Sequence, residues 1–200
     1  MTTKLDARQL RNCFGHWATG VAVVGYDVDG EPRGATINGF TSVSIDPPLV
    51  LVSFARTARA SQALVDRPFS VTFLGEDQLQ LALHFAGRPR EGLEIPWAQN
   101  VEVPRLLGGI GWIECRPWKN YEGGDHVLFL GEIVRYDAWR GKPLIFFTGD
   151  FRIVGLPIYE LPRIIPLDGR PIAEWVGQAH RFHELSEVHP DYDLGASDLT

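Results

Sequence analysis

The sequence has few cysteines, no excess of positive charge and no long hydrophobic run, and each absence excludes a class of protein. Its two cysteines, Cys13 and Cys115, show no Cys-x-x-Cys spacing, which argues against a disulfide framework and predicts two small buried side chains. Acidic residues outnumber basic ones by 25 to 19, and the net charge of −6 argues against a nucleic-acid or anionic-membrane partner. No apolar run approaches the ~20 residues that span a bilayer. We therefore expect a cytoplasmic protein without a membrane segment.

The usual signatures of a protein nucleophile or a Rossmann nucleotide site are also missing. The sequence has no Gly-x-Ser-x-Gly and no phosphate loop ending in Gly-Lys-Ser or Gly-Lys-Thr, and the glycines of residues 108–111 precede a predicted strand instead of a helix. An enzyme built on this chain would therefore rely on a cofactor. A flavin fits, because hydride transfer between two rings needs alignment more than a protein acid or base. His180, His183 and His189 form no closed ligand set, and we predict no metal site.

What the sequence does contain is a series of short β-type runs separated by turn residues. About seven such runs with two or three helices predict a mainly β fold, closed into a barrel with helices at its rim. The expected strands include 21–26, 49–54, 69–74, 109–115, 127–136 and 144–147, and the expected helices are 6–17, 59–65 and 76–85. The apolar run 49–54 favours a strand buried on both faces, and the aperiodic residues 87–107 are expected to form a mobile loop.

The C-terminal part differs from the rest of the chain in its residue pattern. Prolines at 157, 162, 166 and 171 precede Ile172, Trp175, Val176, Ala179 and Phe182, which recur at helical spacing. We therefore expect a domain over residues 1–154 and a C-terminal arm with an amphipathic helix over residues 155–200.

A polar, small-residue segment over residues 34–44 is the main candidate for a binding site. It reads GATINGFTSVS, and its short hydroxyl and amide side chains accompany Gly34 and Gly39, which lack the Cβ that would keep a ligand away from the backbone. Arg56 and Arg59 follow the next strand, and they fit either phosphate donors or solvent-facing loop charges. We predict a cradle for a flat, phosphate-bearing ligand.

Three ring side chains each have two interpretations. His126 follows Gly-Gly-Asp and opens a strand, so it is either a turn histidine satisfied by the backbone or a site residue. Phe85 ends a helix beside the predicted loop and is either core or a wall for an aromatic ligand, and the pattern alone favours core. Phe151 has the same ambiguity.

Five segments together resemble the flavin reductase-like family, the small NAD(P)H:flavin oxidoreductase components of two-component monooxygenases. They follow the family's order over about residues 8–154, and they are ATGVAVV at 18–24, the cradle at 34–44, DPPLVLV at 46–52, FSVTFL at 69–74 and GGDHVLFLGEI at 123–133. The resemblance implies an FMN-binding split β-barrel of Greek-key type that works as a homodimer. It also implies reduction of FMN or FAD with NADH or NADPH, and supply of reduced flavin to a partner flavin-dependent monooxygenase.

The resemblance further implies roles for individual positions. Contacts with the flavin ring and ribityl chain would fall on Thr36, Asn38, Thr41 and Ser42. Backbone contacts would come from Ser53, Phe54 and Ala55, and phosphate contacts from Arg59 and Ser61. Phe85 would flank the flavin, and Phe151 would border the nicotinamide pocket. His126 would face the nicotinamide and is the candidate catalytic residue.

Two other functions stay open on this sequence. One is a non-catalytic flavin-binding or carrier protein on the same barrel, and the other is a flavoenzyme with permanently bound FMN that acts on another small molecule. The chain also departs from the family's pattern, which often has Ser at the positions of Gly39 or Thr41 and Arg at the position of His84. Residues 87–107 match poorly, which leaves the choice of nicotinamide open.

Overall fold

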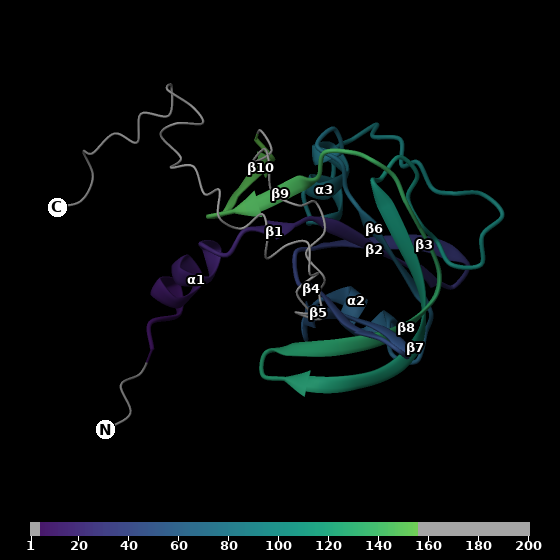
Figure 1. Cartoon of the computed structure of the whole chain (residues 1–200), viewed down its shortest axis with the longest axis horizontal. Helices are drawn as coiled ribbons and strands as arrows, with labels where there is room; N and C mark the ends of the chain where they lie inside the picture. Colours follow the sequence, from purple (N-terminus) through teal and green to yellow (C-terminus); the bar gives the residue numbers. More distant parts are fainter. Residues whose placement is uncertain (1–4, 156–200) are drawn as a thin grey trace, which may run out of the picture. The chain divides into compact units, whose positions relative to one another are not determined.

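The computed structural model describes residues 5–155, which form a mainly antiparallel β structure (Figure 1). The larger sheet has seven strands in the order β3-β2-β6-β7-β8-β5-β4, and a three-stranded sheet has the order β1-β9-β10. The strands are β1 Thr19–Gly20, β2 Ala22–Val28, β3 Glu31–Ile37, β4 Phe40–Ile45, β5 Pro48–Ala55, β6 Phe69–Phe73, β7 Gly111–Gly123, β8 His126–Ala138, β9 Leu144–Phe147 and β10 Asp150–Ile153. The helices are α1 Ala7–Gly15, α2 Arg59–Ala63 and α3 Leu79–Phe85. None of the helices in this part of the chain has the length and apolar composition needed to cross a bilayer.

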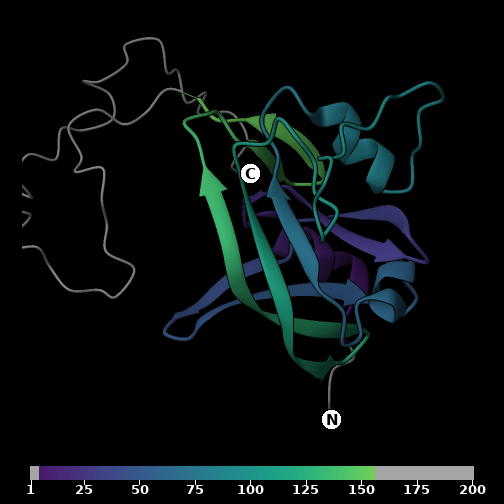
Figure 2. The ribbon, with the colours of Figure 1, turned by 90° about the vertical axis from the view of Figure 1, so that its right-hand side faces the viewer.

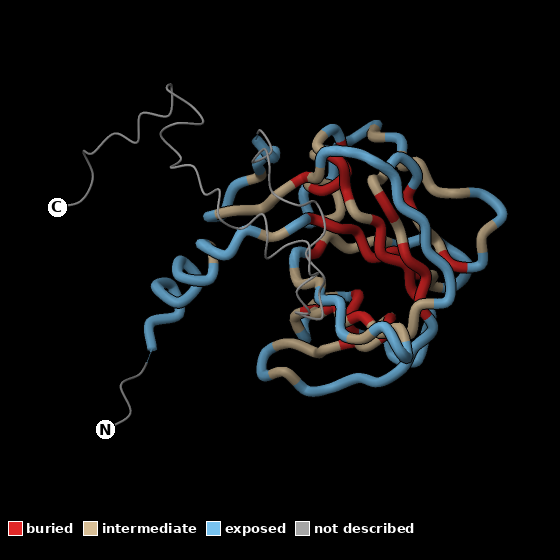
Figure 3. Tube along the Cα trace, viewed as in Figure 1, coloured by how far each residue is buried: buried red, intermediate tan, exposed pale blue. Residues whose placement is uncertain are grey.

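The larger sheet curls around a hydrophobic core and confirms the expected barrel (Figure 2). Its two edge strands, β3 and β4, are consecutive in the chain and are joined through Asn38 and Gly39. The core contains side chains from both halves of the sheet, among them Val24, Val52 and Phe129, and buried residues concentrate in the strands (Figure 3). The cradle sequence therefore runs along the line where the two edges of the barrel meet.

A second hydrophobic cluster covers the outer face of β2. Val23 alternates with the barrel-core residues of β2 and packs with Leu81 and Ala82 of α3 and with Leu144 of β9. Helix α3 and the small sheet therefore cover one part of the barrel's outer surface.

Helix α1 confirms the helix expected near the N-terminus but buries none of its residues. The Asp6 carboxylate accepts from the backbone N–H groups of Arg8 and Gln9, at 2.7 and 3.1 Å. The helix projects from the barrel (Figure 1), and its end is held by the Thr148 N–H, which donates to the Gly15 carbonyl at 2.8 Å.

Two expectations from the sequence are wrong in detail. Cys13 is exposed because it lies on α1, whereas Cys115 is buried in β7 as predicted. The strand that follows the diproline is not buried on both faces. Val50, Val52 and Phe54 are buried and alternate with half-buried residues, as expected for a strand with one face on a barrel core.

Much of the expected mobile loop is instead packed onto the barrel, although residues 87–92 are exposed. The Ser70 hydroxyl donates to the Pro104 carbonyl at 2.5 Å, and a Cβ on Gly25 would lie only 2.1 Å from that carbonyl oxygen. Leu106 is buried and forms an isolated bridge with Trp97. The segment shows no sequence periodicity because it forms no regular helix or strand. Tertiary contacts hold it in place instead.

A buried carboxylate also ties this loop to the sheet. Glu114 of β7 is 1% exposed and accepts from the Arg135 Nε at 2.7 Å, while the Arg105 Nε lies 3.6 Å from its other oxygen. The Arg105 guanidinium sits 4.1 Å from the ring centroid of Trp112. The two arginines compensate the buried charge, so we interpret the cluster as structural.

Candidate active site

The register of three neighbouring strands brings four of the predicted residues to one face of the sheet. In β5, Ser53 and Ala55 alternate with the buried residues and therefore lie on the outer face. Ala55 stands opposite His126 of β8, and Thr41 of β4 stands opposite Leu51, which has the same parity as Ser53. Residues directly opposite each other in an antiparallel pair share a face. Thr41, Ser53, Ala55 and His126 thus form one outer strip.

Gly39 belongs to the same strip. Its carbonyl accepts from the Ser53 N–H at 3.2 Å, and a Cβ at this position would lie 2.5 Å from the Ser53 hydroxyl. The Ser53 side chain therefore takes the space of the missing Cβ, and approach of a ligand to the Gly39 backbone stays a prediction. At Gly34 the space of the missing Cβ is occupied by the Phe85 ring at 2.7 Å. The role of Gly34 is therefore to let Phe85 pack on β3.

His126 is oriented by its neighbour in the chain. Its Nδ1 lies 2.8 Å from the Asp125 carboxylate, which can only accept, so Nδ1 carries the proton and Nε2 is left for another partner. The hydrogen bond from His126 lowers the pKa of Asp125, and the charge of His126 adds to this effect. The imidazole side chain is 44% exposed and can reach a ligand on the outer strip.

Arg56 and Arg59 have different surroundings. Arg56 donates to the Gly124 carbonyl at 2.7 Å and pairs with Glu122, so it holds the β7–β8 turn that carries His126. Arg59 is the first residue of α2 and is exposed, and its charge counteracts the burial that raises the pKa of Tyr26. Among residues 5–155, Arg59 makes no ion pair, which leaves it available to a phosphate.

Several predicted residues lie off the outer strip. Phe54 points into the core against Phe129, with ring centroids 6.2 Å apart, so only its backbone is available to a ligand. Ser42 pairs with the buried Val50 and lies on the opposite face from Thr41. Ser61 is buried in α2.

Two further predicted residues belong to the α3 side of the barrel. The Thr36 hydroxyl donates to the Ala82 carbonyl at 2.7 Å, which leaves its lone pairs for other partners. Phe85 packs edge-on against Trp97 with centroids 5.6 Å apart. Both interpretations of Phe85 are therefore compatible, because it is half-buried core and also a wall beside β3.

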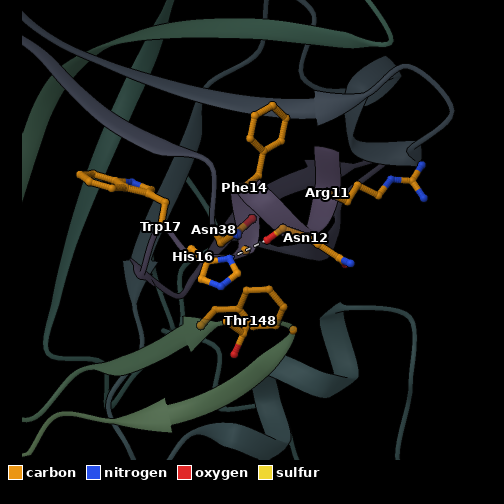
Figure 4. Close-up of a pocket in the computed structure, with 10 residues that line it drawn as sticks. Arg11, Asn12, Phe14, His16, Trp17, Asn38 and Thr148 are labelled. Atoms are coloured by element: carbon orange, nitrogen blue, oxygen red, sulfur yellow. Dashed lines mark hydrogen bonds between the residues drawn. The ribbon is translucent and has the colours of Figure 1, made fainter. Parts of the chain in front are cut away.

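A pocket of about 540 Å³ opens beside Asn38 (Figure 4). Its walls come from α1 and the residues just after it, from Asn38 itself, and from the β9–β10 hairpin. Phe146 lines it and packs against the predicted Phe151 with centroids 5.4 Å apart. The sequence reasoning missed Arg11, His16 and the hairpin residues, because helical spacing indicated only which face of α1 is apolar.

Two buried polar atoms near the site have no hydrogen-bond partner within the described range. They are the Thr19 hydroxyl and the His84 Nδ1. Thr19 pairs with Phe146 in the small sheet, and His84 packs against Phe85 with centroids 5.0 Å apart. Such groups are costly to bury alone. On the outer surface, the exposed Asn38 amide and Thr41 hydroxyl suit a ligand with carbonyl, amide and hydroxyl groups, as a flavin has.

Comparisons with known proteins show the family of the chain. Residues 14–155 match the family model described as "Flavin reductase like domain". An NADH-dependent FAD reductase of Streptomyces globisporus is 40% identical over 153 residues, covering 72% of this chain and 83% of that protein. A second relative is the reductase component of the 4-nitrophenol 4-monooxygenase/4-nitrocatechol 2-monooxygenase of Rhodococcus opacus. It is 36% identical over 149 residues, covering 74% of this chain and 80% of that protein.

One solved structure is similar over most of its length. It is the Streptomyces globisporus NADH:FAD oxidoreductase in complex with NAD and FAD fragments. The TM-score is 0.69 at 35% identity, with 79% of this chain and 100% of that chain covered.

Proposed function

Because the chain belongs to the flavin reductase-like family, we propose that it is an NADH-dependent flavin reductase on a split β-barrel. The reaction moves a hydride from the nicotinamide C4 to the flavin N5, and a proton from solvent completes the reduced flavin. The alignment of two rings supplies most of the catalysis in such a transfer, because no protein nucleophile takes part.

The observation that carries this proposal is the pairing of Ala55 with His126. It puts the strand with the predicted flavin contacts directly beside the residue predicted to face the nicotinamide. Two planar substrates stacked on the outer strip would therefore meet Ser53 and Ala55 on one side and His126 on the other. Since Asp125 holds the His126 Nδ1–H, the imidazole presents Nε2 to the nicotinamide carboxamide.

The remaining predicted residues would hold the flavin. Asn38 and Thr41 are exposed, and their short polar side chains suit the ring's carbonyls and nitrogens. Arg59 would meet the phosphate, and Phe85 would flank the ring from the α3 side.

We also propose that the protein is a cytoplasmic homodimer with a monooxygenase partner. A homodimer is supported by exposed apolar side chains on β4 and β7, of which Ile45 is 83% exposed and Trp118 is 43% exposed. The partner would be a flavin-dependent monooxygenase that takes up the reduced flavin, as the name of the Rhodococcus relative suggests. The two free cysteines and the use of NADH favour the cytoplasm.

The division into a reductase domain over residues 1–154 and an extension over 155–200 likewise stays a proposal. The amphipathic helix expected from the sequence and the histidines at 180, 183 and 189 lie outside the described residues. Truncation at Gly155 tests the extension, because unchanged assembly, flavin affinity and turnover would remove any role for it in the reductase.

Steady-state oxidation of NADH and of NADPH, each with FMN and with FAD, tests the proposed activity. We expect rapid, flavin-dependent consumption of NADH and release of reduced flavin into solution. Flavin binding without consumption would favour a carrier protein. Protein that purifies with flavin tightly bound, and that reduces no added flavin, would favour a flavoenzyme acting on another molecule.

A further inference from the structure

The pocket beside Asn38 contains two groups that the proposed hydride transfer does not use, Arg11 and His16. It lies between α1 and the β9–β10 hairpin, and its volume of about 540 Å³ falls within the usual range for small-molecule sites. Aromatic side chains, one cation and several uncharged polar groups line it. This combination suits a ligand that carries both an aromatic base and an anionic group.

Arg11 is the cation at this pocket. Its side chain extends outward from α1 (Figure 4), and it makes no ion pair with any residue of the range 5–155. Its charge is therefore available to an anionic group of a ligand in the pocket.

His16 supplies a directed polar atom. Its Nδ1 lies 2.9 Å from the Asn12 carbonyl, which can only accept, so Nδ1 is the donor and Nε2 is free. The ring packs edge-on against Phe147 with centroids 6.3 Å apart, which holds it between the helix and the hairpin (Figure 4). Nε2 can accept from an amino or hydroxyl group inside the pocket.

The β9–β10 hairpin forms the wall of the pocket opposite α1, and it leaves space for a ligand. Gly149 has a φ of +86°, and a Cβ there would meet nothing within 4 Å. Phe146 offers a ring that Phe151 holds in place, and Trp17, 79% exposed, also lines the pocket. An aromatic base can stack on such rings, and its hydroxylated sugar can meet the polar groups.

We propose that this pocket binds the adenosine diphosphate part of a dinucleotide, with Arg11 on the diphosphate and His16 beside the adenosine. The inference rests on the proposed function, because NADH and FAD are the substrates that carry this group. FMN lacks it. The pocket would then add affinity for a dinucleotide whose reactive ring lies on the outer strip, and Arg11 would be a specificity-determining residue.

Equilibrium binding to the full-length protein tests this directly. Calorimetric titrations would use ADP-ribose, NAD⁺, FAD and FMN with the wild type, with Arg11→Gln and with Arg8→Gln. Arg8 is the matched control, because it lies on the same helix, carries the same charge and does not line the pocket. We expect Arg11→Gln to weaken ADP-ribose about tenfold, the size of one charge-assisted hydrogen bond, while FMN binds as before.

The four ligands also separate the possible sources of the diphosphate. Loss of affinity for NAD⁺ alone assigns the pocket to the nicotinamide substrate, loss for FAD alone assigns it to the flavin, and loss for both supports a shared site. A wild type that does not bind ADP-ribose, an Arg11→Gln variant that binds it normally, or equal weakening by Arg8→Gln would overturn the inference. Because ADP-ribose carries no reactive ring, its binding is independent of whether the protein reduces flavin.

Trp17 offers a second readout. ADP-ribose should change the tryptophan fluorescence of the wild type, and Trp17→Phe should abolish most of that change while the calorimetric affinity stays within a few-fold. A change that persists in Trp17→Phe would locate the ligand elsewhere and contradict the assignment.

Discussion

Gly34→Ala tests how the fold builds the wall of the site. A Cβ on Gly34 would lie 2.7 Å from two carbons of the Phe85 ring and 3.1 Å from a third. The ring cannot retreat freely, because it packs against His84 and Trp97 with centroids 5.0 and 5.6 Å away. Overpacking of this kind costs about 1–3 kcal/mol.

Alanine also lowers the conformational entropy of the unfolded chain relative to glycine. This stabilises the folded state and offsets about 0.4–1 kcal/mol of that cost. We therefore expect a net loss of about 1–2 kcal/mol in the free energy of unfolding, seen as a fall of about 2–8 °C in Tm for a chain of this size. Urea and thermal unfolding would measure it. Gly20→Ala is the matched control, since a Cβ there would meet nothing within 4 Å, and it should stay within about 0.5 kcal/mol of the wild type.

A double-mutant cycle identifies Phe85 as the cause of this loss. Once Phe85→Ala has removed the ring, Gly34→Ala should be neutral or slightly stabilising, and the coupling energy should equal the clash. If Gly34→Ala destabilised both backgrounds equally, the contact between β3 and α3 would not be the reason for glycine at this position. A shifted Phe85 should also change flavin affinity if this ring flanks the flavin.

Three further predictions concern other parts of the chain. His126→Ala should raise the KM for NADH about tenfold through loss of one hydrogen bond, with little change in the KM for flavin, and a larger effect on flavin would show that His126 is misplaced. Thiol titration should find only Cys13 reactive in the native protein, because burial and then the charge of Glu114 raise the pKa of Cys115 from 9.0 to about 12. Since the unfolded thiol ionises first, the free energy of unfolding should fall as pH rises from about 9 towards 12, and Cys115→Ala should remove this slope. Gly25→Ala should cost at least about 3 kcal/mol and expose residues 97–107 to limited proteolysis, because its Cβ would meet the Pro104 carbonyl oxygen at 2.1 Å; native-like resistance would contradict the packing of this segment.

Local sequence signals predicted the elements well where one residue type decides the backbone. The helix expected from residue 6 begins at the Asp6 cap, and the Asp27 carboxylate accepts from the Gly30 N–H at 2.9 Å in the turn before β3. Each signal depends on atoms a few residues apart. The prediction of β5 as a strand held for the same reason, although its burial pattern did not, because burial depends on what packs against each face.

The candidate site was also predictable from the sequence only in part. The polar segment indicated Thr41, and the family resemblance implied roles for the Ser53 backbone and for His126. Nothing in the sequence states that β5 pairs with β8 in the register that sets Ala55 against His126. The pocket beside α1 was not predicted, because it joins Gly15 and Thr148, which are far apart in the chain and carry no motif.

The amino-acid sequence by itself determined the β-rich class, the polar cradle between two predicted strands and the membership of a family that binds flavin. These follow from residue types and short spacings, which act through local backbone preference. Only the tertiary structure decided which faces of the strands coincide, that the 87–107 segment packs on the barrel, and that Arg11 and His16 stand beside Asn38. The physical reason is that strand register and helix docking are set by the summed burial of distant side chains, a quantity that no single stretch of sequence contains.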